Sequence, residues 1–281
     1  MVGSRFHLSR FKRLMFFSVF FCVSTFAQGL SQKEADQVLA EFDQTFHAVV
    51  ASHGGDFQPV FVLDQTDLNA YARQETQNGV ELWWILIYGG FAKHPRLTVE
   101  ALDFALCHEL GHHLGGFPFN PGSQWMAVEG EADYFAAQAC LRKLWSKQTE
   151  VNAKFRETVP VLVKEKCDNA WAVASDQDLC YRINRAAMDE LTLQEQTFKS
   201  PPQYDTPDQS VVSKTMGYDH PSPQCRIDTI LSATLCTTQF DFSVIPGRHE
   251  PDGQNSLKAQ EASMRNSCSN SRPACWFKEL N

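Results

Sequence analysis

Beyond its first 27 residues, the chain has no hydrophobic run that reaches the roughly 20 residues needed to cross a bilayer. Basic residues are also scarce, since 25 Lys and Arg stand against 33 Asp and Glu, for a formal net charge of −8. An acidic chain argues against nucleic acid as a partner. We therefore expect neither a stable membrane span after the opening segment nor a complex with nucleic acid.

The opening segment, residues 1–27, has the order typical of a secretory signal peptide. Basic residues come first, an apolar run of about 14 residues follows, and Thr25 and Ala27 are small residues near its end. Cleavage is expected after Ala27, and the alternative is an uncleaved membrane anchor. Cys22 follows Phe21 rather than a small residue, so it is not expected to carry a lipid. The sequence thus predicts an exported protein, periplasmic or extracellular.

The most informative motif is His108-Glu109-Leu110-Gly111-His112, which has the form HExxH. An α-helix turns every 3.6 residues, so both histidines lie on one face and can reach one metal ion. Glu109 projects about 100° round the helix, close enough to hold a metal-bound water and take its proton. A zinc hydrolase needs this arrangement. The alternative is the surface of an ordinary amphipathic helix.

A catalytic zinc site normally has three protein ligands and leaves its fourth position for water. Residues 129–133 read EGEAD, so Glu129 can supply the third ligand, with Asp133 one turn later on the same helix face. Asp133 is expected to accept a hydrogen bond from the ring N–H of His108, or less favourably from that of the second histidine, and so to fix its tautomer. Glu131 is the competing ligand, roughly 200° round the helix.

The longer motif HExxHxxGxxH is incomplete, because Gly115 is present but Pro118 stands where the third histidine would be. A metzincin is therefore not expected, and the ligand set should be two histidines and a glutamate. Cys107 is a further possible ligand, but it lies about 100° round the helix from His108.

An even set of cysteines is typical of disulfides in an exported chain. Nine cysteines are present, and eight remain once Cys22 is removed. Short separations favour the pairs Cys167–Cys180, Cys225–Cys236 and Cys268–Cys275. Cys107 and Cys140 are then left to join the two segments that carry the expected ligands.

Residues 79–88 form a strongly β-prone run. A protease must hold its substrate extended, and an exposed edge of this strand beside the metal could do so through backbone hydrogen bonds. The alternative is a buried core strand.

Apolar spacing and capping residues predict the other elements. Thr98 is the expected N-cap of the HExxH helix, with its end at Gly115-Gly116, and Ser123 and Ser222 are expected to cap two later helices. The remaining expectations are a helix over 31–52, a strand over 57–63, a helix over about 124–144, largely helical structure over 151–199, a short helix through 235 and an irregular tail after 242.

Four blocks occur in a fixed order between about residues 67 and 231: Asn69-Ala70-Tyr71-Ala72, the HExxH segment, the EGEAD segment and His220-Pro221-Ser222-Pro223-x-x-Arg226-Ile227. As a set, they resemble the metallopeptidase family that includes HtpX, the CAAX prenyl endopeptidases and the periplasmic BepA-type proteases. The resemblance implies an α+β, mainly helical zincin-like metalloprotease domain with a small β-sheet and an active-site helix. This domain is expected over 28–240, followed by an irregular cysteine-containing tail over 241–281.

The resemblance also implies site residues. It supports zinc bound by His108, His112 and Glu129, with Glu109 as the base. His220 takes an active-site role by resemblance, either steadying the oxyanion, for which Tyr218 is the competing residue, or closing over the metal. Arg226 matches the arginine of the last block and is expected to pair with an acidic residue near the site.

Two departures from the family limit what the resemblance carries. Membrane-embedded members have several transmembrane helices, so processing of prenylated proteins is not implied, and no tetratricopeptide period follows the last block. The expected function is an exported zinc metalloendopeptidase that hydrolyses a protein or peptide substrate. The alternatives are a zinc-bearing zincin-fold chaperone or binding protein without turnover, and a structural disulfide-stapled domain without metal. The sequence predicts neither cleavage specificity nor oligomeric state.

Overall fold

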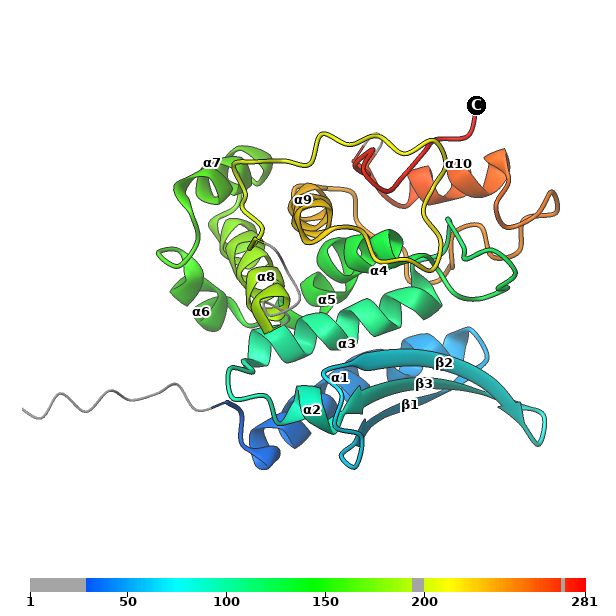
Figure 1. Ribbon diagram of the computed structural model, residues 1–281, viewed down its shortest axis with the longest axis horizontal. Helices are drawn as coiled ribbons and strands as arrows, with labels where there is room; N and C mark the ends of the chain where they lie inside the picture. Colours follow the sequence, from blue (N-terminus) through cyan, green and yellow to red (C-terminus); the bar gives the residue numbers. More distant parts are fainter. Residues whose placement is uncertain (1–28, 194–199, 269–270) are drawn as a thin grey trace, which may run out of the picture.

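The computed structural model describes residues 29–193, 200–268 and 271–281, so the expected signal peptide and Cys22 lie outside the described residues. Figure 1 shows a small sheet on one side of the molecule, the long helix α3 along it, and further helices beyond α3. The predicted α+β class is confirmed at this level. In the described part of the chain, no helix is both long and apolar enough to span a bilayer.

The sheet has three strands in the order β1-β3-β2: β1 (Gly55–Val62), β2 (Ala70–Gln77) and β3 (Val80–Tyr88). β1 runs parallel to β3, and β2 runs antiparallel to it. Asn78 and Gly79 join β2 to β3 with φ angles of 53° and 81°, the positive values that a tight hairpin turn requires.

The central position of β3 corrects one expectation. Residues 79–88 do not present a free edge, because β3 is bonded on both sides, and Trp83, Ile85 and Ile87 on its inner face are fully buried. The core-strand alternative is therefore the correct one. The outer strands are β1 and β2, of which β2 was not predicted as a strand.

Helix α1 (Gln32–Ser52) forms where the apolar spacing predicts it. Ser31 caps its first turn and exchanges hydrogen bonds with Glu34 in a capping box. Its buried face, with Phe42 and Phe46, packs against β1 and α3.

Helix α3 (Val99–Leu114) carries the HExxH motif and begins at the predicted cap, since Thr98 Oγ1 accepts a hydrogen bond of 3.1 Å from the Ala101 N–H. Every residue from 101 to 114 is buried. The helix lies between the sheet and helices α4 and α8 (Figure 1). Polar groups on such a helix must find partners inside the protein.

The helix expected over 124–144 begins later than predicted. Ser123 Oγ does accept hydrogen bonds from Trp125 N and Met126 N, but it closes a turn, and Ala127 then forms a β-bridge with Phe119. Helical structure starts only at Glu129 and has three consecutive parts: α4 (Glu129–Phe135), the π-helix η1 (Ala136–Cys140) and α5 (Leu141–Trp145).

The helices between 149 and 193 agree with the expectation for 151–199, of which 194–199 lies outside the described residues, whereas α2 (Gly89–Ala92) was not predicted. Ser222 Oγ caps α9 through Cys225 N at 3.1 Å, as predicted, whereas residues 257–265 form a helix within the tail that was expected to be irregular. The elements are α2 (Gly89–Ala92), α6 (Thr149–Asn152), the 3-10 turn η2 (Ala153–Phe155), α7 (Val161–Ala170), α8 (Ala174–Leu193), α9 (Pro223–Thr234) and α10 (Leu257–Arg265).

Four disulfides are present: Cys107–Cys140, Cys167–Cys180, Cys225–Cys275 and Cys236–Cys268. The first two confirm the predicted pairs, and the last two replace Cys225–Cys236 and Cys268–Cys275. Cys225 and Cys236 lie at opposite ends of α9, about 16 Å apart at 1.5 Å per residue, which is too far for a disulfide. The C-terminal segment instead returns to α9.

Candidate metal centre

Three predicted ligands converge between α3 and α4. His108 and His112 project from α3, Glu129 is the first residue of α4, and their ligand atoms all lie within 4.8 Å of one another. His108 Nε2 is 3.1 Å from Glu129 Oε2, and His112 Nε2 is 3.7 Å from Glu129 Oε1. All three residues are buried. The structure therefore brings together two imidazoles and a carboxylate at the spacing that a single ion would occupy.

Hydrogen bonds on the outer side of each imidazole set its orientation. His108 Nδ1 lies 2.8 Å from Asp133 Oδ1, which confirms the predicted pair, and His112 Nδ1 lies 2.9 Å from the Ala127 carbonyl oxygen. An acceptor at Nδ1 places the ring proton there and leaves the Nε2 lone pair facing Glu129. Both rings thus present Nε2 inward, where a metal ion could bind.

Arg226 of α9 pairs with Asp133, which agrees with the expectation that it pairs with an acidic residue near the site. Its Nε and Nη2 donate to the two carboxylate oxygens of Asp133, each at 2.8 Å, and Nη2 is 3.7 Å from Glu190 Oε2. Burial works to raise the pKa of Asp133, but the charges of Arg226 and His108 outweigh it and hold the pKa far below its usual range. Asp133 is consequently a permanent carboxylate at neutral pH.

The three donors also shift one another's protonation. Burial opposes ionisation of Glu129, but the nearby imidazoles of His112 and His108 lower its pKa to about 2. Burial lowers the pKa of His112. For His108, burial works in the same direction, but Asp133 and Glu129 together raise its pKa well above the ordinary value. The cluster is therefore built around a fixed negative charge, which suits a cation.

Glu109, the predicted base, is buried beside this cluster. Burial raises the pKa of Glu109 to about 7, although the charge of His108 and a hydrogen bond from the Ala72 backbone work against the rise. A general base works best when its pKa lies close to the working pH. The bond from Ala72 also ties the base to the outer strand β2.

Glu131, the competing ligand, faces away from the histidines. It forms a two-point ion pair with Arg272, with distances of 2.6 Å and 2.7 Å. The roughly 200° between alternate helix residues explains why only Glu129 reaches the imidazoles. Cys107 is also excluded as a ligand, because it is bonded to Cys140.

A cleft of about 310 Å³ opens over the donors. The N-terminal end of β2 forms one wall, so the backbone of an edge strand lies directly beside Glu109. This wall is a part of the site that the sequence analysis missed, because β2 reads AYARQETQ and shows no alternation of apolar and polar residues. The other lining residues are Phe91, Ala105, Met126, Glu190, Tyr218, His220 and Arg226.

The structure places His220 at the mouth of the cleft. Its Nε2 lies 3.1 Å from Glu129 Oε2, its ring is stacked 6.4 Å from that of His108, and its side chain is 62% exposed. The hydroxyl of Tyr218 donates to the Pro121 carbonyl oxygen at 2.9 Å. Of the two candidates for an oxyanion donor, His220 is thus the one in contact with the donor cluster.

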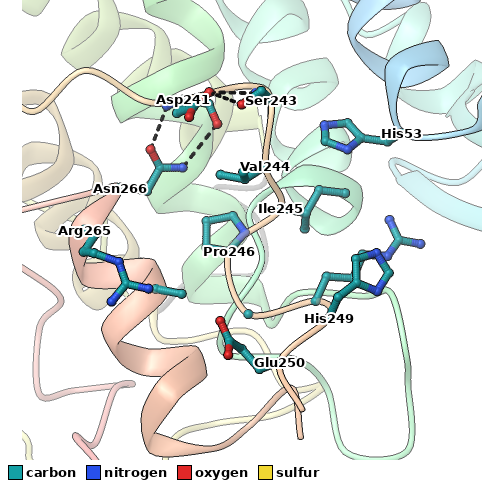
Figure 2. A pocket seen from close by; sticks show the side chains of 13 residues that line it. His53, Asp241, Ser243, Val244, Ile245, Pro246, His249, Glu250, Arg265 and Asn266 are labelled. Atoms are coloured by element: carbon teal, nitrogen blue, oxygen red, sulfur yellow. Dashed lines mark hydrogen bonds between the residues drawn. The ribbon is translucent and has the colours of Figure 1, made fainter. Parts of the chain in front are cut away.

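A second cavity, of about 510 Å³, lies between the 241–250 loop, α10 and the end of α1 (Figure 2). Among the described residues, its lining shares none with the cleft. The Asp241 carboxylate in its wall accepts hydrogen bonds from Ser243, and the Asp241 backbone is bonded to Asn266. Another group of possible ligand atoms, at Asp208, Cys225 and Cys275, is not suited to a metal, because the two sulfurs are joined in a disulfide.

Comparison of the chain with protein-family models, with curated proteins and with solved structures finds no match. The features that bear on function are therefore the donor cluster, the buried Glu109 and the cleft.

Proposed function

We propose that this chain is a zinc-dependent metalloendopeptidase of the kind its four sequence blocks resemble. The observation that carries the proposal is the cluster of His108, His112 and Glu129, whose ligand atoms lie within 4.8 Å of one another next to an open cleft. Two imidazole nitrogens and one carboxylate oxygen are a ligand set that catalytic zinc uses, with a fourth position left for water. The hydrogen bonds at both Nδ1 atoms support the same reading, since metal-bound histidines are usually held in this way.

Bound zinc would lower the pKa of a water molecule towards about 7 and polarise the scissile carbonyl group. The chain's own residues would carry the proton. Glu109 is buried beside the donors, and its pKa of about 7 lets it accept a proton from water and pass it to the leaving amine near neutral pH. His220 stands where a ring N–H could stabilise the developing oxyanion.

The substrate would lie along β2. An outer strand offers backbone N–H and C=O groups that bind an extended peptide irrespective of most of its side chains. Residues 69–72 line the cleft, and the Ala72 backbone contacts the base, so a peptide paired with this edge passes over Glu109. This geometry favours cleavage within a peptide over hydrolysis of a small molecule.

Four disulfides stabilise the described structure, and such bonds persist in oxidising compartments. Together with the signal-peptide pattern of residues 1–27, they support export as part of the proposal. A protein that binds zinc without turnover is the rival reading. The presence of Glu109 in a buried position beside the donors favours the enzyme.

The deciding experiment compares the native protein with Glu109→Gln. Zinc content is measured by elemental analysis, and cleavage is measured by mass spectrometry on casein and on a complex peptide mixture. We expect one zinc per chain in both proteins and fragments from the native protein only. Zinc in both proteins without any fragments would support the binding protein, and no zinc in either would exclude both zinc functions. Equal cleavage by both would remove Glu109 from the role of base.

A further inference from the structure

The C-terminal segment, residues 271–278, contacts the face of α4 opposite the metal donors. Glu129 and Glu131 are separated by one residue in this helix, and they face opposite ways: Glu129 faces the histidines and Glu131 faces Arg272. Both partners of the Glu131–Arg272 pair are almost fully buried, with 3% and 6% of their side chains exposed. Arg272 also donates to Ser263 and Ser267 at 2.9 Å and 3.0 Å. The pair is therefore held in one geometry.

Trp276 of the same segment packs against Gly130, the residue between the two glutamates. A Cβ atom on Gly130 would lie 2.3 Å from the Trp276 ring, so only glycine fits. The indole Nε1 donates to Thr229 Oγ1 of α9 at 2.9 Å. On the other side of α4, a Cβ on Gly111 of α3 would lie 2.8 Å from Ala132 Cα. Helix α4 is consequently held between α3 and the C-terminal segment.

The first turn of this helix has no side-chain cap. α4 continues without a break into η1 and α5, but its N-cap is Val128, which has no side-chain oxygen to accept a backbone N–H. Glu129 stands at the first helical position, where an α-helix is least constrained by its own hydrogen bonds. A metal site tolerates deviations of only about 0.2 Å in its ligand distances. A small rotation of α4 about its axis would thus displace the Glu129 carboxylate from the histidines.

The C-terminal segment also contacts the loop before His220 and helix α9. The Trp276 and Ala274 carbonyl oxygens each accept a backbone hydrogen bond of 2.9 Å, from Met216 N and Val212 N, in the loop that leads to His220. Cys275 is bonded to Cys225, the residue before Arg226. The same eight residues therefore contact three of the parts that surround the donors.

We infer that Arg272 and Trp276 are positioning residues for the metal centre, which fix the rotation of α4 so that Glu129 meets His108 and His112. This inference rests on the metal site of the proposed function, and it assigns to the C-terminal segment a part in metal binding that lies outside the four sequence blocks. Arg272 acts through Glu131 and Trp276 through Gly130, since these are the residues of α4 that they contact.

The test measures zinc affinity by competition with a chromophoric chelator in the full chain. Arg272→Met alone leaves a buried carboxylate without its partner, so the informative variant is the double change Glu131→Gln with Arg272→Met. The matched control is Glu100→Gln with Arg182→Met, because Arg182 is equally buried, pairs with Glu100 at 3.1 Å and lies over the Trp145 ring. Circular dichroism establishes that both variants are folded.

We expect the zinc Kd of the Glu131/Arg272 variant to rise about 10- to 100-fold, as for other contacts that orient metal ligands, and that of the control to stay within about twofold. The visible spectrum of bound Co²⁺ should change only in the first. Gly130→Ala should weaken zinc binding similarly. Adding Trp276→Leu to the Gly130→Ala variant should partly restore zinc binding, because the smaller side chain makes room for the new methyl group.

Native zinc affinity in a folded Glu131/Arg272 variant would overturn the inference, as would equal loss in the control. The outcome is separate from that of the peptidase proposal. A native chain that binds zinc without cutting peptides would leave the positioning role standing and remove the enzymatic one. A native chain that binds no zinc would overturn both.

Discussion

Arg226 and Asp133 are joined by two parallel hydrogen bonds of 2.8 Å, although they lie 93 residues apart in the chain. Asp133 holds a third partner, the Nδ1 atom of His108. The arginine thus fixes the carboxylate that fixes the imidazole, and a residue of the last sequence block orients His108 of the candidate metal centre through Asp133. Such planar, two-point pairing is specific to arginine among the basic residues.

Asp133→Asn should weaken both metal binding and folding. The change removes the charge that orients His108 and leaves the Arg226 guanidinium buried without its closest carboxylate. We expect a zinc Kd about 10 to 100 times higher, and a free energy of unfolding lower by about 3 to 5 kcal/mol. Chelator competition and urea unfolding measure the two effects. Asp178→Asn breaks another arginine pair, with Arg156, and should leave the zinc Kd unchanged; equal effects of both substitutions would argue against the orienting role.

His220→Ala should lower kcat by about 10²- to 10³-fold, the usual loss when an oxyanion donor is removed. The zinc content should stay at one per chain, since His220 lies outside the three-donor set. Tyr218→Phe serves as the comparison and should have little effect, because its hydroxyl is engaged by the Pro121 carbonyl. Steady-state kinetics on a fluorogenic peptide measures both. A faster His220→Ala enzyme would instead assign His220 to closing over the metal.

Removal of the Cys107–Cys140 disulfide should affect stability and zinc binding together. The bond joins the residue before His108 to the helical segment that follows Asp133, across a sequence separation of 33. Chain-entropy arguments give a loss of about 4 kcal/mol for the double alanine variant, and a several-fold rise in zinc Kd should accompany it. The matched control removes Cys167–Cys180, with a separation of 13 and about 3 kcal/mol of stability, and should bind zinc normally. A normal zinc Kd in both variants would make the first bond purely structural.

The parts of this site that follow from local periodicity could be read from the sequence. His108, Glu109 and His112 are fixed relative to one another by one helix, and Glu129 and Asp133 by another, so their shared faces needed no knowledge of the tertiary fold. The pairing of Asp133 with His108 followed once the two helices were taken as neighbours. The Thr98 and Ser222 caps were equally local.

The parts that depend on long-range packing could not be read in this way. The Ala127 carbonyl reaches His112 because Ala127 pairs with Phe119 in a β-bridge instead of lying in a helix. The apolar run of 79–88 gives no sign of which strand lies at the sheet edge, because a central and an outer strand share the same propensity. Cys225 meets Cys275 only because the C-terminal segment folds back over α4 and α9. Sequence distance is a poor guide to such contacts.

Asp103 should give the folded protein a characteristic dependence on pH. It lies on α3, two residues before Ala105 of the cleft wall, and is 5% exposed. Burial raises the pKa of Asp103 to about 7 from 3.8, against the opposing effects of the Trp145 hydrogen bond and the Arg182 charge. The folded state therefore keeps the proton up to about pH 7, whereas the unfolded chain releases it near pH 4.

This difference in pKa decides whether stability rises or falls with pH. Because the unfolded state binds fewer protons between about pH 4 and 7, stability falls as the pH rises through that window. The loss attributable to Asp103 over the whole window is on the order of 4 kcal/mol, since its pKa of about 7 lies about 3 units above 3.8 and one pKa unit corresponds to about 1.4 kcal/mol. Asp103→Asn removes the titration but keeps an oxygen that can accept from Trp145 Nε1, which donates to the carboxylate at 2.9 Å. Urea unfolding of both proteins at pH 5 and pH 8 should therefore show a smaller decrease for the variant, and parallel decreases would mean that Asp103 does not titrate in this range.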